Sequence, residues 1–320
     1  MRVLLWHVHG SWTTAFVQGA HQYLVPVNAA RDADGLGRAS TWDWPASVRE
    51  VPMERLADSD PELVVLQRPR DLDLVRQWLR QEPGRDLPAV FVEHNTPRGD
   101  LGKARHPLAG RCDIPVVHVT HFNELYWDTG RAPTTVIEHG ICDPGYRYSG
   151  ELPRAAVAVN EPIRRGRITG TDLLPRLSRT VALDVFGMRV AGLGRALGVP
   201  PDRLVEHDDP PQSTLHDLMA ARRVYLHPVR WTSLGLSLLE AMHLGMPVVA
   251  VAATEAAEAV PPGAGVVSAR IDVLEDALRE LIGEPQRARG MGWQARQAAL
   301  RRYGLPRFLG DWDQLLKEVT

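Results

Sequence analysis

Residues 232–240 combine an expected helix start with a carboxylate at a spacing that suits phosphate and ribose binding. The helix is expected to open at Gly235 and Leu236, where unpaired N–H groups and the positive end of the helix dipole form a site for phosphate oxygens. Glu240 follows about one turn later. There its carboxylate can accept hydrogen bonds from the two hydroxyls of a ribose. An ordinary amphipathic helix with an exposed glutamate explains the same spacing.

The residues on either side of this helix predict a loop, a helix and a buried strand in series. Thr232 and Ser233 are expected to cap the helix with their hydroxyls. Gly245 suits the left-handed position that ends a helix. The apolar residues 248–251 then predict a buried strand.

This segment resembles the donor-site signature of retaining GT-B glycosyltransferases, the glycosyltransferase group 1 or family 4 enzymes with a Glu-x7-Glu motif. The matching residues are Leu234-Gly235-Leu236, Leu238-Leu239-Glu240-Ala241-Met242, Gly245 and Pro247-Val248-Val249-Ala250. The resemblance implies that Thr232, Ser233, Leu234, Gly235, Leu236 and Glu240 bind the donor. Thr232 stands where the family has its first glutamate, which contacts the transferred sugar. That change implies an unusual donor preference or a weakened enzyme.

Residues 160–174 resemble the basic region that opens the second domain of these enzymes. Arg164 falls on the family arginine, whereas Thr169 falls on the family lysine. Arg165 or Arg167 is expected to substitute for that lysine, because a guanidinium binds a diphosphate with two parallel hydrogen bonds. Arg164 is accordingly assigned a catalytic role, the neutralisation of charge that develops on the β-phosphate.

Two loops in the first half are expected to complete the site. Gly10 and Ser11 follow the first buried strand and precede a helix expected near Ala15, the place of the family's glycine-containing loop near the donor phosphates. His94 follows another buried strand and matches a family histidine that contacts the donor sugar, which makes it the second catalytic candidate. A capped helix start and a histidine held by backbone groups are the plainer alternatives.

Three further features carry weaker hypotheses. Residues 96–111 form a basic loop that either binds an anionic acceptor or a membrane surface, or is simply solvated. His118 and His121 have a metal-like spacing, but on a strand that spacing directs the rings to opposite faces. Cys112 and Cys142 indicate neither a disulfide framework nor a metal cluster. No metal site is expected.

Short apolar runs alternate with helical patterns, which predicts stacked β-α units with parallel sheets. The strands are expected at residues 3–6, 63–66, 89–92, 116–119, 135–137, 156–159, 183–186, 224–226, 248–251 and 265–267. The helices are expected at residues 71–81, 215–221 and 272–282, with a helical tail over residues 289–320. This pattern and the resemblance imply an α/β GT-B fold, in which two Rossmann-like domains face each other across a cleft.

The expected domains are an acceptor-side domain over residues 1–148 and a nucleotide-sugar donor domain over residues 149–302. The boundary lies in the linker-like residues 142–153. In the resembling family a final helix, here residues 303–320, packs back on the first domain. Its expected contact residues are Trp312, Leu315 and Leu316.

Composition is consistent with a cytoplasmic enzyme. The 320 residues, 44% of them hydrophobic, suffice for two cores. The formal net charge of -2 argues against a general nucleic-acid binder. The apolar run at residues 1–8 is too short for a signal sequence or a membrane span.

The expected function is transfer of a sugar from a nucleoside-diphosphate sugar to an acceptor hydroxyl. Retention of the anomeric configuration and independence of metal are implied by the resemblance. The nucleotide sugar is a co-substrate, no other cofactor is expected, and the acceptor is a small molecule, a lipid or a glycan. Two alternatives stay open: a sugar-nucleotide epimerase of the same architecture, and a non-catalytic nucleotide-sugar-binding homologue, which Thr169 and Thr232 favour. The motifs of dinucleotide oxidoreductases, P-loop enzymes and α/β hydrolases are not found.

Overall fold

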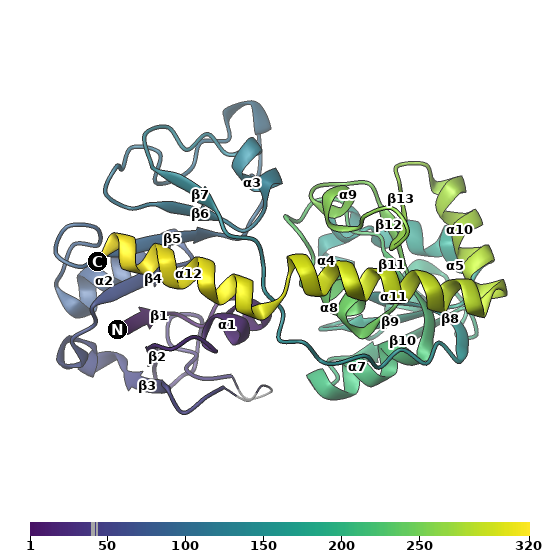
Figure 1. The fold of residues 1–320 in the computed structure, drawn as a ribbon, viewed down its shortest axis with the longest axis horizontal. Coiled ribbons are helices and arrows are strands. Elements are labelled where there is room, and N and C mark those ends of the chain that lie inside the picture. Colours follow the sequence, from purple (N-terminus) through teal and green to yellow (C-terminus); the bar gives the residue numbers. More distant parts are fainter. Residues whose placement is uncertain (40–41, 43) are drawn as a thin grey trace. The chain divides into compact units, whose positions relative to one another are not determined.

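The chain forms two α/β units in a computed structural model that describes residues 1–39, 42 and 44–320 (Figure 1). The first unit comprises Met1–Cys142 and Leu305–Thr320, and the second comprises Asp143–Gly304. The predicted first domain ends at residue 148, within the linker-like residues 142–153, whereas the structure divides the units between residues 142 and 143. The reason is that the N–H groups of Arg147 and Tyr148 donate to the carbonyl oxygen of Leu244, at 3.2 and 3.1 Å, and so attach this segment to the second unit.

A seven-stranded parallel sheet in the order β3-β2-β1-β4-β5-β6-β7 forms the centre of the first unit. Its strands are Arg2–Leu5 (β1), Gln22–Val27 (β2), Val48–Pro52 (β3), Leu63–Leu66 (β4), Ala89–Glu93 (β5), Val116–His118 (β6) and Thr134–Val136 (β7). Its helices are Gly10–Phe16 (α1), Pro69–Leu79 (α2), His121–Tyr126 (α3) and Leu305–Val319 (α12), with short 3-10 helices at Met53–Ser59 (η1) and Leu101–Lys103 (η2). Strands β2 and β3 extend the sheet on one side of β1, and β4 to β7 extend it on the other side, so the switch point lies between β1 and β4.

The second unit repeats this plan with a six-stranded parallel sheet in the order β10-β9-β8-β11-β12-β13. Its strands are Leu152–Ala158 (β8), Leu183–Gly187 (β9), Leu204–Asp208 (β10), Arg222–His227 (β11), Val248–Val251 (β12) and Gly265–Ser268 (β13). Its helices are Pro162–Arg165 (α4), Leu174–Thr180 (α5), Leu193–Leu197 (α6), Gln212–Ala221 (α7), Leu236–Leu244 (α8), Ala256–Ala259 (α9), Ile271–Gly283 (α10) and Pro285–Arg302 (α11), with Gly166–Thr169 (η3) and Thr171–Leu173 (η4) as 3-10 turns. Both sheets therefore have Rossmann-like topology.

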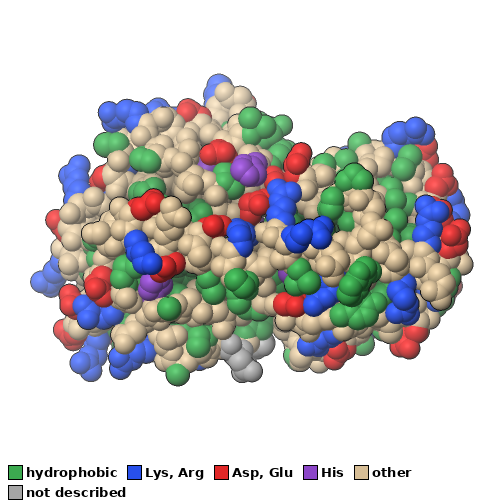
Figure 2. All heavy atoms as spheres, in the orientation of Figure 1, with side chains coloured by type: hydrophobic (Ala, Val, Ile, Leu, Met, Phe, Trp, Pro, Cys, Tyr) green, Lys and Arg blue, Asp and Glu red, His purple; other side chains and the backbone are tan. Residues whose placement is uncertain are grey.

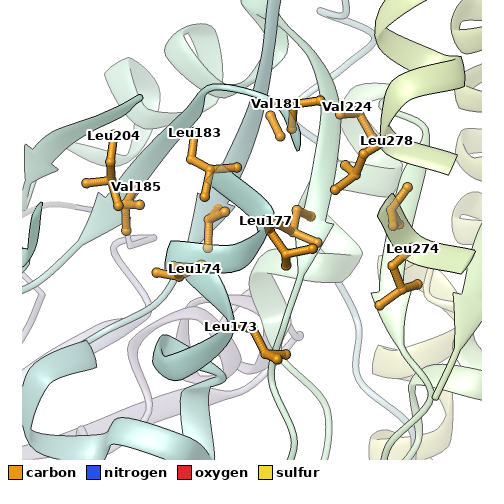
Figure 3. Close-up of a cluster of buried hydrophobic side chains, with 14 of the residues drawn as sticks. Leu173, Leu174, Leu177, Val181, Leu183, Val185, Leu204, Val224, Leu274 and Leu278 are labelled. Atoms are coloured by element: carbon orange, nitrogen blue, oxygen red, sulfur yellow. The ribbon is translucent and has the colours of Figure 1, made fainter. Parts of the chain in front are cut away.

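The core of the second unit lies between its sheet and the helices on it. Leu174 and Leu177 of α5 and Leu274 and Leu278 of α10 are buried against strand residues such as Val185 (Figure 3). A second cluster fills the first unit and joins β1, β4, β5 and α2. Because parallel strands are buried on both faces, most of them appear in the sequence as continuous apolar runs.

Three strands that the apolar runs do not indicate are β2, β3 and β10. Strands β3 and β10 are edge strands with exposed polar residues, so they lack a continuous apolar run. Strand β2 contains Pro26, and a proline weakens a strand prediction because its nitrogen cannot donate to the ladder.

Helix α12 belongs to the first unit although it follows the second in sequence (Figure 1). Trp312 and Leu316 are fully buried there, and Leu315 is half-buried. The indole of Trp312 meets the rings of Trp12 and Phe16 of α1 edge-on, at centroid distances of 5.7 and 5.1 Å. The return of the last helix to the first unit is thus present.

Candidate functional site

The loops after β8 and β11 define a candidate site in the second unit. These strands are neighbours, and the chain leaves them toward opposite halves of the sheet. In open parallel sheets, ligands bind beyond the carboxyl ends of the strands at such a switch point. The loop after β8 leads to α4 and η3, which carry Arg164, Arg165 and Arg167. The loop after β11 leads to α8, which contains Glu240.

Helix α8 begins at Leu236, with Gly235 as its N-cap. A Cβ atom on Gly235 would lie 2.6 Å from Cε1 of His227, the buried last residue of β11. The hydroxyl of Tyr225 lies 3.0 Å from Oγ of Ser237 and 3.4 Å from Nδ1 of His227. The start of α8 therefore rests directly on a buried histidine, and only glycine fits between them.

His227 and Tyr225, the side chains that contact the start of α8, are uncharged near neutral pH. Burial lowers the pKa of His227 to about 4, so its ring is neutral. Burial also raises the pKa of Tyr225, which keeps its phenol protonated. The positive potential at this edge therefore comes from the first N–H groups of α8 and from the arginines beside it.

Thr232 and Ser233 do not occupy the capping position predicted for them. The helix starts three residues later than Ser233, because Gly235 takes the extended N-cap conformation. Ser233 is buried and its carbonyl oxygen accepts from the N–H of Glu255 at 3.3 Å. Leu234 is buried as well, and Thr232 is half-buried in the loop that leads to the helix.

Glu240 is buried on the side of α8 that faces α7. Its Oε2 lies 3.7 Å from Nε2 of His216, a residue that is itself buried. The amide nitrogen of Gln212 lies 3.0 Å from the same histidine nitrogen. The hypothesis of an exposed glutamate on a plain amphipathic helix is therefore wrong: Glu240 is held in a polar pair between two helices.

Arg164 and Arg167, which follow β8, pair with carboxylates. Arg164 is exposed and forms an ion pair with Glu161, which also accepts from Arg189 at 2.8 Å. The hydrogen bond from Arg164 keeps the pKa of Glu161 below its usual range. Arg167 is exposed and donates to Asp172 at 2.9 Å. Arg165 is half-buried.

Thr169 is buried in the turn of η3. Its hydroxyl donates to the carbonyl oxygen of Gly166 at 3.1 Å and lies 2.9 Å from the hydroxyl of Thr171. The Thr171 hydroxyl in turn donates to the carbonyl oxygen of Pro162. Thr169 therefore stabilises the turn internally and presents no cation.

Arg230 also lies at this site, although it is not among the site residues predicted from the sequence. Its guanidinium donates to Asp172 at 2.5 and 3.2 Å and to the carbonyl oxygen of Arg167 at 3.2 Å. The sequence feature that could have identified it is that Arg230 is the one cationic residue in the segment 229–235, which directly precedes α8.

The first unit gathers three histidines at the carboxyl ends of its strands. His94 follows β5, His9 follows β1, and their rings lie 4.0 Å apart between centroids. His139 follows β7 and is buried, and neither of its ring nitrogens has a hydrogen-bond partner within the described chain. Burial lowers the pKa of all three histidines, to about 4 for His9 and about 3 for His139. Trp12 meets the ring of His94 edge-on at 5.0 Å.

Gly10 and Ser11 lie in the first turn of α1, not in a loop that precedes a helix near Ala15. The carbonyl oxygen of His9 already accepts from the N–H of Thr13 at 2.8 Å, which starts the helix early. A Cβ atom on Gly10 would lie 2.4 Å from the ring of Trp42, so this glycine is explained by packing.

Three cationic residues of the basic loop lie beside carboxylates in the structure. Lys103 lies 3.3 Å from Asp100, Arg105 lies 3.8 Å from Asp128, and Arg111 binds Asp113. His106 is buried, and its Nε2 lies 3.2 Å from Glu93. An anionic acceptor or a membrane surface as the partner of this loop stays a prediction.

The expected strand geometry of His118 and His121 is wrong, because His118 ends β6 whereas His121 begins α3. Within the part of the chain that the structure describes, no three His, Cys, Asp or Glu residues are grouped to hold a metal ion. None of the helices in residues 1–39, 42 and 44–320 has the length and apolarity to cross a membrane. On the face shown in Figure 2, acidic and basic side chains are interspersed over each unit.

Comparisons with known proteins agree with this geometry. Residues 207–298 match the family model of glycosyl transferases group 1, a segment that includes α8 and Glu240. No curated protein matches the chain. The match covers 92 of the 320 residues, all of them in the second unit, and the predicted enzyme class, a glycosyltransferase, is confirmed.

Solved structures resemble the chain over its whole length. A sucrose-phosphate synthase from Thermosynechococcus elongatus has a TM-score of 0.74 at 15% identity, with 99% of this chain and 98% of that chain covered. HepE of Anabaena, in complex with UDP and glucose, has a TM-score of 0.73 at 16% identity, with 99% and 100% covered. A glycosyltransferase from Rickettsia africae has a TM-score of 0.63 at 12% identity, with 99% and 98% covered. These likenesses confirm the predicted fold class, two Rossmann-like domains as in GT-B glycosyltransferases.

Proposed function

We propose that this chain transfers a sugar from a nucleoside-diphosphate sugar to an acceptor hydroxyl. One observation carries the proposal: the switch point of the second unit brings the half-buried N-terminus of α8 and the arginine-bearing turn after β8 to the carboxyl edge of neighbouring strands. A helix N-terminus and guanidinium groups are the two devices that bind phosphate oxygens most directly.

The second unit supplies the groups that a diphosphate leaving group needs. The N–H groups that begin α8, with Arg164 and either Arg165 or Arg167, would hold its oxygens and neutralise the charge that develops as the sugar leaves. Arg164 and Arg167 each pair with a carboxylate, so the donor has to share or replace these ion pairs. Preorganised charge of this kind stabilises the transition state more than the ground state.

Glu240 is proposed to bind the ribose hydroxyls of the donor. A carboxylate accepts from both hydroxyls of a cis-diol, and His216 at 3.7 Å keeps this side chain in place between α7 and α8. HepE is solved with UDP and UDP-glucose, which supports a UDP-sugar as the first donor to test.

The first unit is proposed to contribute His94 to the transferred sugar and to bind the acceptor. The buried ring of His94 is neutral, because burial and the neighbouring His9 and His139 lower its pKa. A neutral imidazole can donate or accept a hydrogen bond at a sugar hydroxyl. Gly10 and Ser11, at the start of α1, remain proposed donor contacts.

Retention of the anomeric configuration and metal independence are also proposed. They are supported by the similarity of residues 234–250 to the donor signature of retaining enzymes. The proposed location is the cytoplasm. The acceptor is a small molecule, a lipid or a glycan.

Thermal unfolding with a panel of UDP, GDP, ADP, dTDP and their sugars tests the proposal. A ligand that binds only the folded chain raises the melting temperature. We expect one nucleotide family to stabilise the wild-type chain and the Glu240→Gln variant to lose most of that shift. Arg176→Gln is the matched control, since Arg176 pairs with Glu275 on another part of the unit and should leave the shift unchanged.

Product analysis then separates the alternatives. Sugar transfer with an unchanged anomeric configuration, insensitive to a metal chelator, supports the full proposal. Isomerised nucleotide sugar without transfer indicates the epimerase. Binding without turnover over a broad acceptor panel favours the non-catalytic homologue, and no stabilisation by any nucleotide contradicts the proposed site.

A further inference from the structure

We propose that Arg230 is a binding residue for the diphosphate of the donor, held ready by Asp172 beside the start of α8. The inference rests on the proposed function and deepens it, because it adds a residue that neither the family match nor the donor signature assigns.

The first observation is where Arg230 lies. It belongs to the loop that joins β11 to α8, five positions before the N-cap Gly235. Its N–H donates to the carbonyl oxygen of Ile168 at 2.9 Å, and the N–H of Trp231 donates to the same oxygen at 3.3 Å. The loop after β11 is therefore fixed to the turn that carries Arg167.

Close backbone packing secures this junction. A Cβ atom on Gly170 would lie 2.0 Å from the carbonyl oxygen of Pro228, so only glycine allows the turn to approach the loop this closely. Gly170 also has a φ of 73°, which L side chains rarely adopt. The two loops of the switch point are thus in direct backbone contact, and Arg230 lies at this junction.

The second observation is the order of the guanidinium group. Asp172 accepts from Arg230 at 2.5 and 3.2 Å, a bidentate pair, and the carbonyl oxygen of Arg167 accepts at 3.2 Å. The Arg230 side chain is 26% exposed, compared with 68% for Arg164 and 78% for Arg167. Arg230 is therefore ordered before any ligand binds, whereas Arg164 and Arg167 would lose more freedom on binding.

The third observation is the charge balance. Arg167 and Arg230 share the single carboxylate of Asp172, so the three side chains carry one net positive charge. Burial raises the pKa of Asp172, but the hydrogen bond and charge of Arg230 and the charge of Arg167 outweigh it and lower that pKa. Asp172 stays ionised, and one of the two positive charges is not balanced by it.

The neighbouring threonine does not supply this charge. Thr169 has its hydroxyl engaged inside the turn, with Gly166 and Thr171. A diphosphate at the start of α8 would therefore meet Arg230 as the ordered cation on the same loop.

Calorimetric titration of Arg230→Gln tests the inference. The ligands are the nucleoside diphosphate that stabilises the wild-type chain most, with UDP expected, and its parent nucleoside. We expect the variant to bind the diphosphate at least about tenfold more weakly, as for the loss of a charge-assisted hydrogen bond. Its affinity for the nucleoside should stay within about twofold. Arg176→Gln removes the same charge from α5, where Arg176 pairs with Glu275 of α10, and should change neither affinity.

The results discriminate a ligand contact from a structural role. Equal diphosphate affinity in Arg230→Gln and wild type would overturn the inference, and so would an equal loss for diphosphate and nucleoside, which indicates a disturbed loop. Arg230→Lys keeps the charge without the planar fork and should fall between the two. A wild-type chain that binds no nucleoside diphosphate would contradict the proposed function as well.

Discussion

Gly235 shows how a single residue sets the start of the candidate phosphate site. Its backbone φ of -72° is ordinary, so conformational freedom does not explain the glycine. The explanation is contact: the buried ring of His227 occupies the space where a Cβ atom would lie. The first N–H groups of α8 thereby stay at the end of β11, next to the segment that carries Arg230.

Gly235→Ala is expected to lower the free energy of unfolding by about 1–3 kcal/mol, the usual result of overpacking, here against the buried ring of His227. It should also weaken nucleotide binding, because the added methyl group collides with His227 and moves the start of α8. Urea unfolding and calorimetry measure the two effects. Gly310→Ala is the control, since a Cβ atom at that helical position meets nothing within 4 Å. It should be neutral or stabilising by up to about 1 kcal/mol. A Gly235→Ala chain as stable and as active in binding as wild type would refute this explanation.

At the scale of elements, α12 packs on a unit other than the one that directly precedes it in the sequence. It follows α11, the last helix of the second unit, after a break at residues 303–304. Yet it packs on α1, where Trp312, Trp12 and Phe16 form one aromatic cluster. The helix also binds through Arg307, which donates to the carbonyl oxygens of Glu138 and His139 at 2.9 and 2.6 Å. It therefore supports both α1 and the turn that carries His139.

Trp312→Ala is expected to destabilise the chain by about 3–5 kcal/mol, because it removes a fully buried indole and leaves a cavity. The free energy of unfolding in urea, followed by circular dichroism, gives the value. Trp293→Ala is the matched control, since Trp293 of α11 is 52% exposed and should cost less than about 1 kcal/mol. Similar losses for both variants would mean that α12 is not anchored through Trp312.

At the scale of the whole molecule, both units bury histidines without charging them. Burial lowers the pKa of His9, His118 and His227 to about 4, and that of His139 to about 3. The unfolded chain titrates near the ordinary histidine pKa of about 6.5. Below that pH the unfolded state binds protons that the folded state does not, so acid favours unfolding.

Stability is therefore expected to be complete above about pH 6.5 and to fall as the pH decreases toward 4. Each buried histidine contributes a slope of about 1.4 kcal/mol per pH unit in that window. Urea unfolding at pH 8, 7, 6 and 5 measures the slope. His118→Leu should reduce this slope, because it removes a residue whose pKa falls on folding. Within the described chain neither ring nitrogen of His118 has a hydrogen-bond partner, so the variant loses no hydrogen bond. His121→Gln changes an exposed residue and should leave it unaltered. A pH-independent free energy of unfolding would contradict the neutral buried state.

The sequence alone determined the elements whose signal is local. Continuous apolar runs such as residues 63–66 and 248–251 became strands β4 and β12 with the expected bounds, because strands buried on both faces need apolar residues throughout. The donor-like segment predicted a helix before β12 and placed Gly235 and Glu240 on it. The early start of α1 and the edge strands carried no such signal, since their residues are explained by contacts with distant parts of the chain.

Only the tertiary structure decided what the polar residues of the site do. Arg230 became part of it because β11 lies beside β8, so that Asp172 and the turn after β8 meet the loop before α8. Likewise His216 meets Glu240 only because α7 packs on α8. Ion pairs and close backbone contacts join residues far apart in sequence, and no periodicity along the chain encodes them. The residue types of a phosphate site were thus readable from the sequence, whereas their partners were fixed by the packing of two parallel sheets.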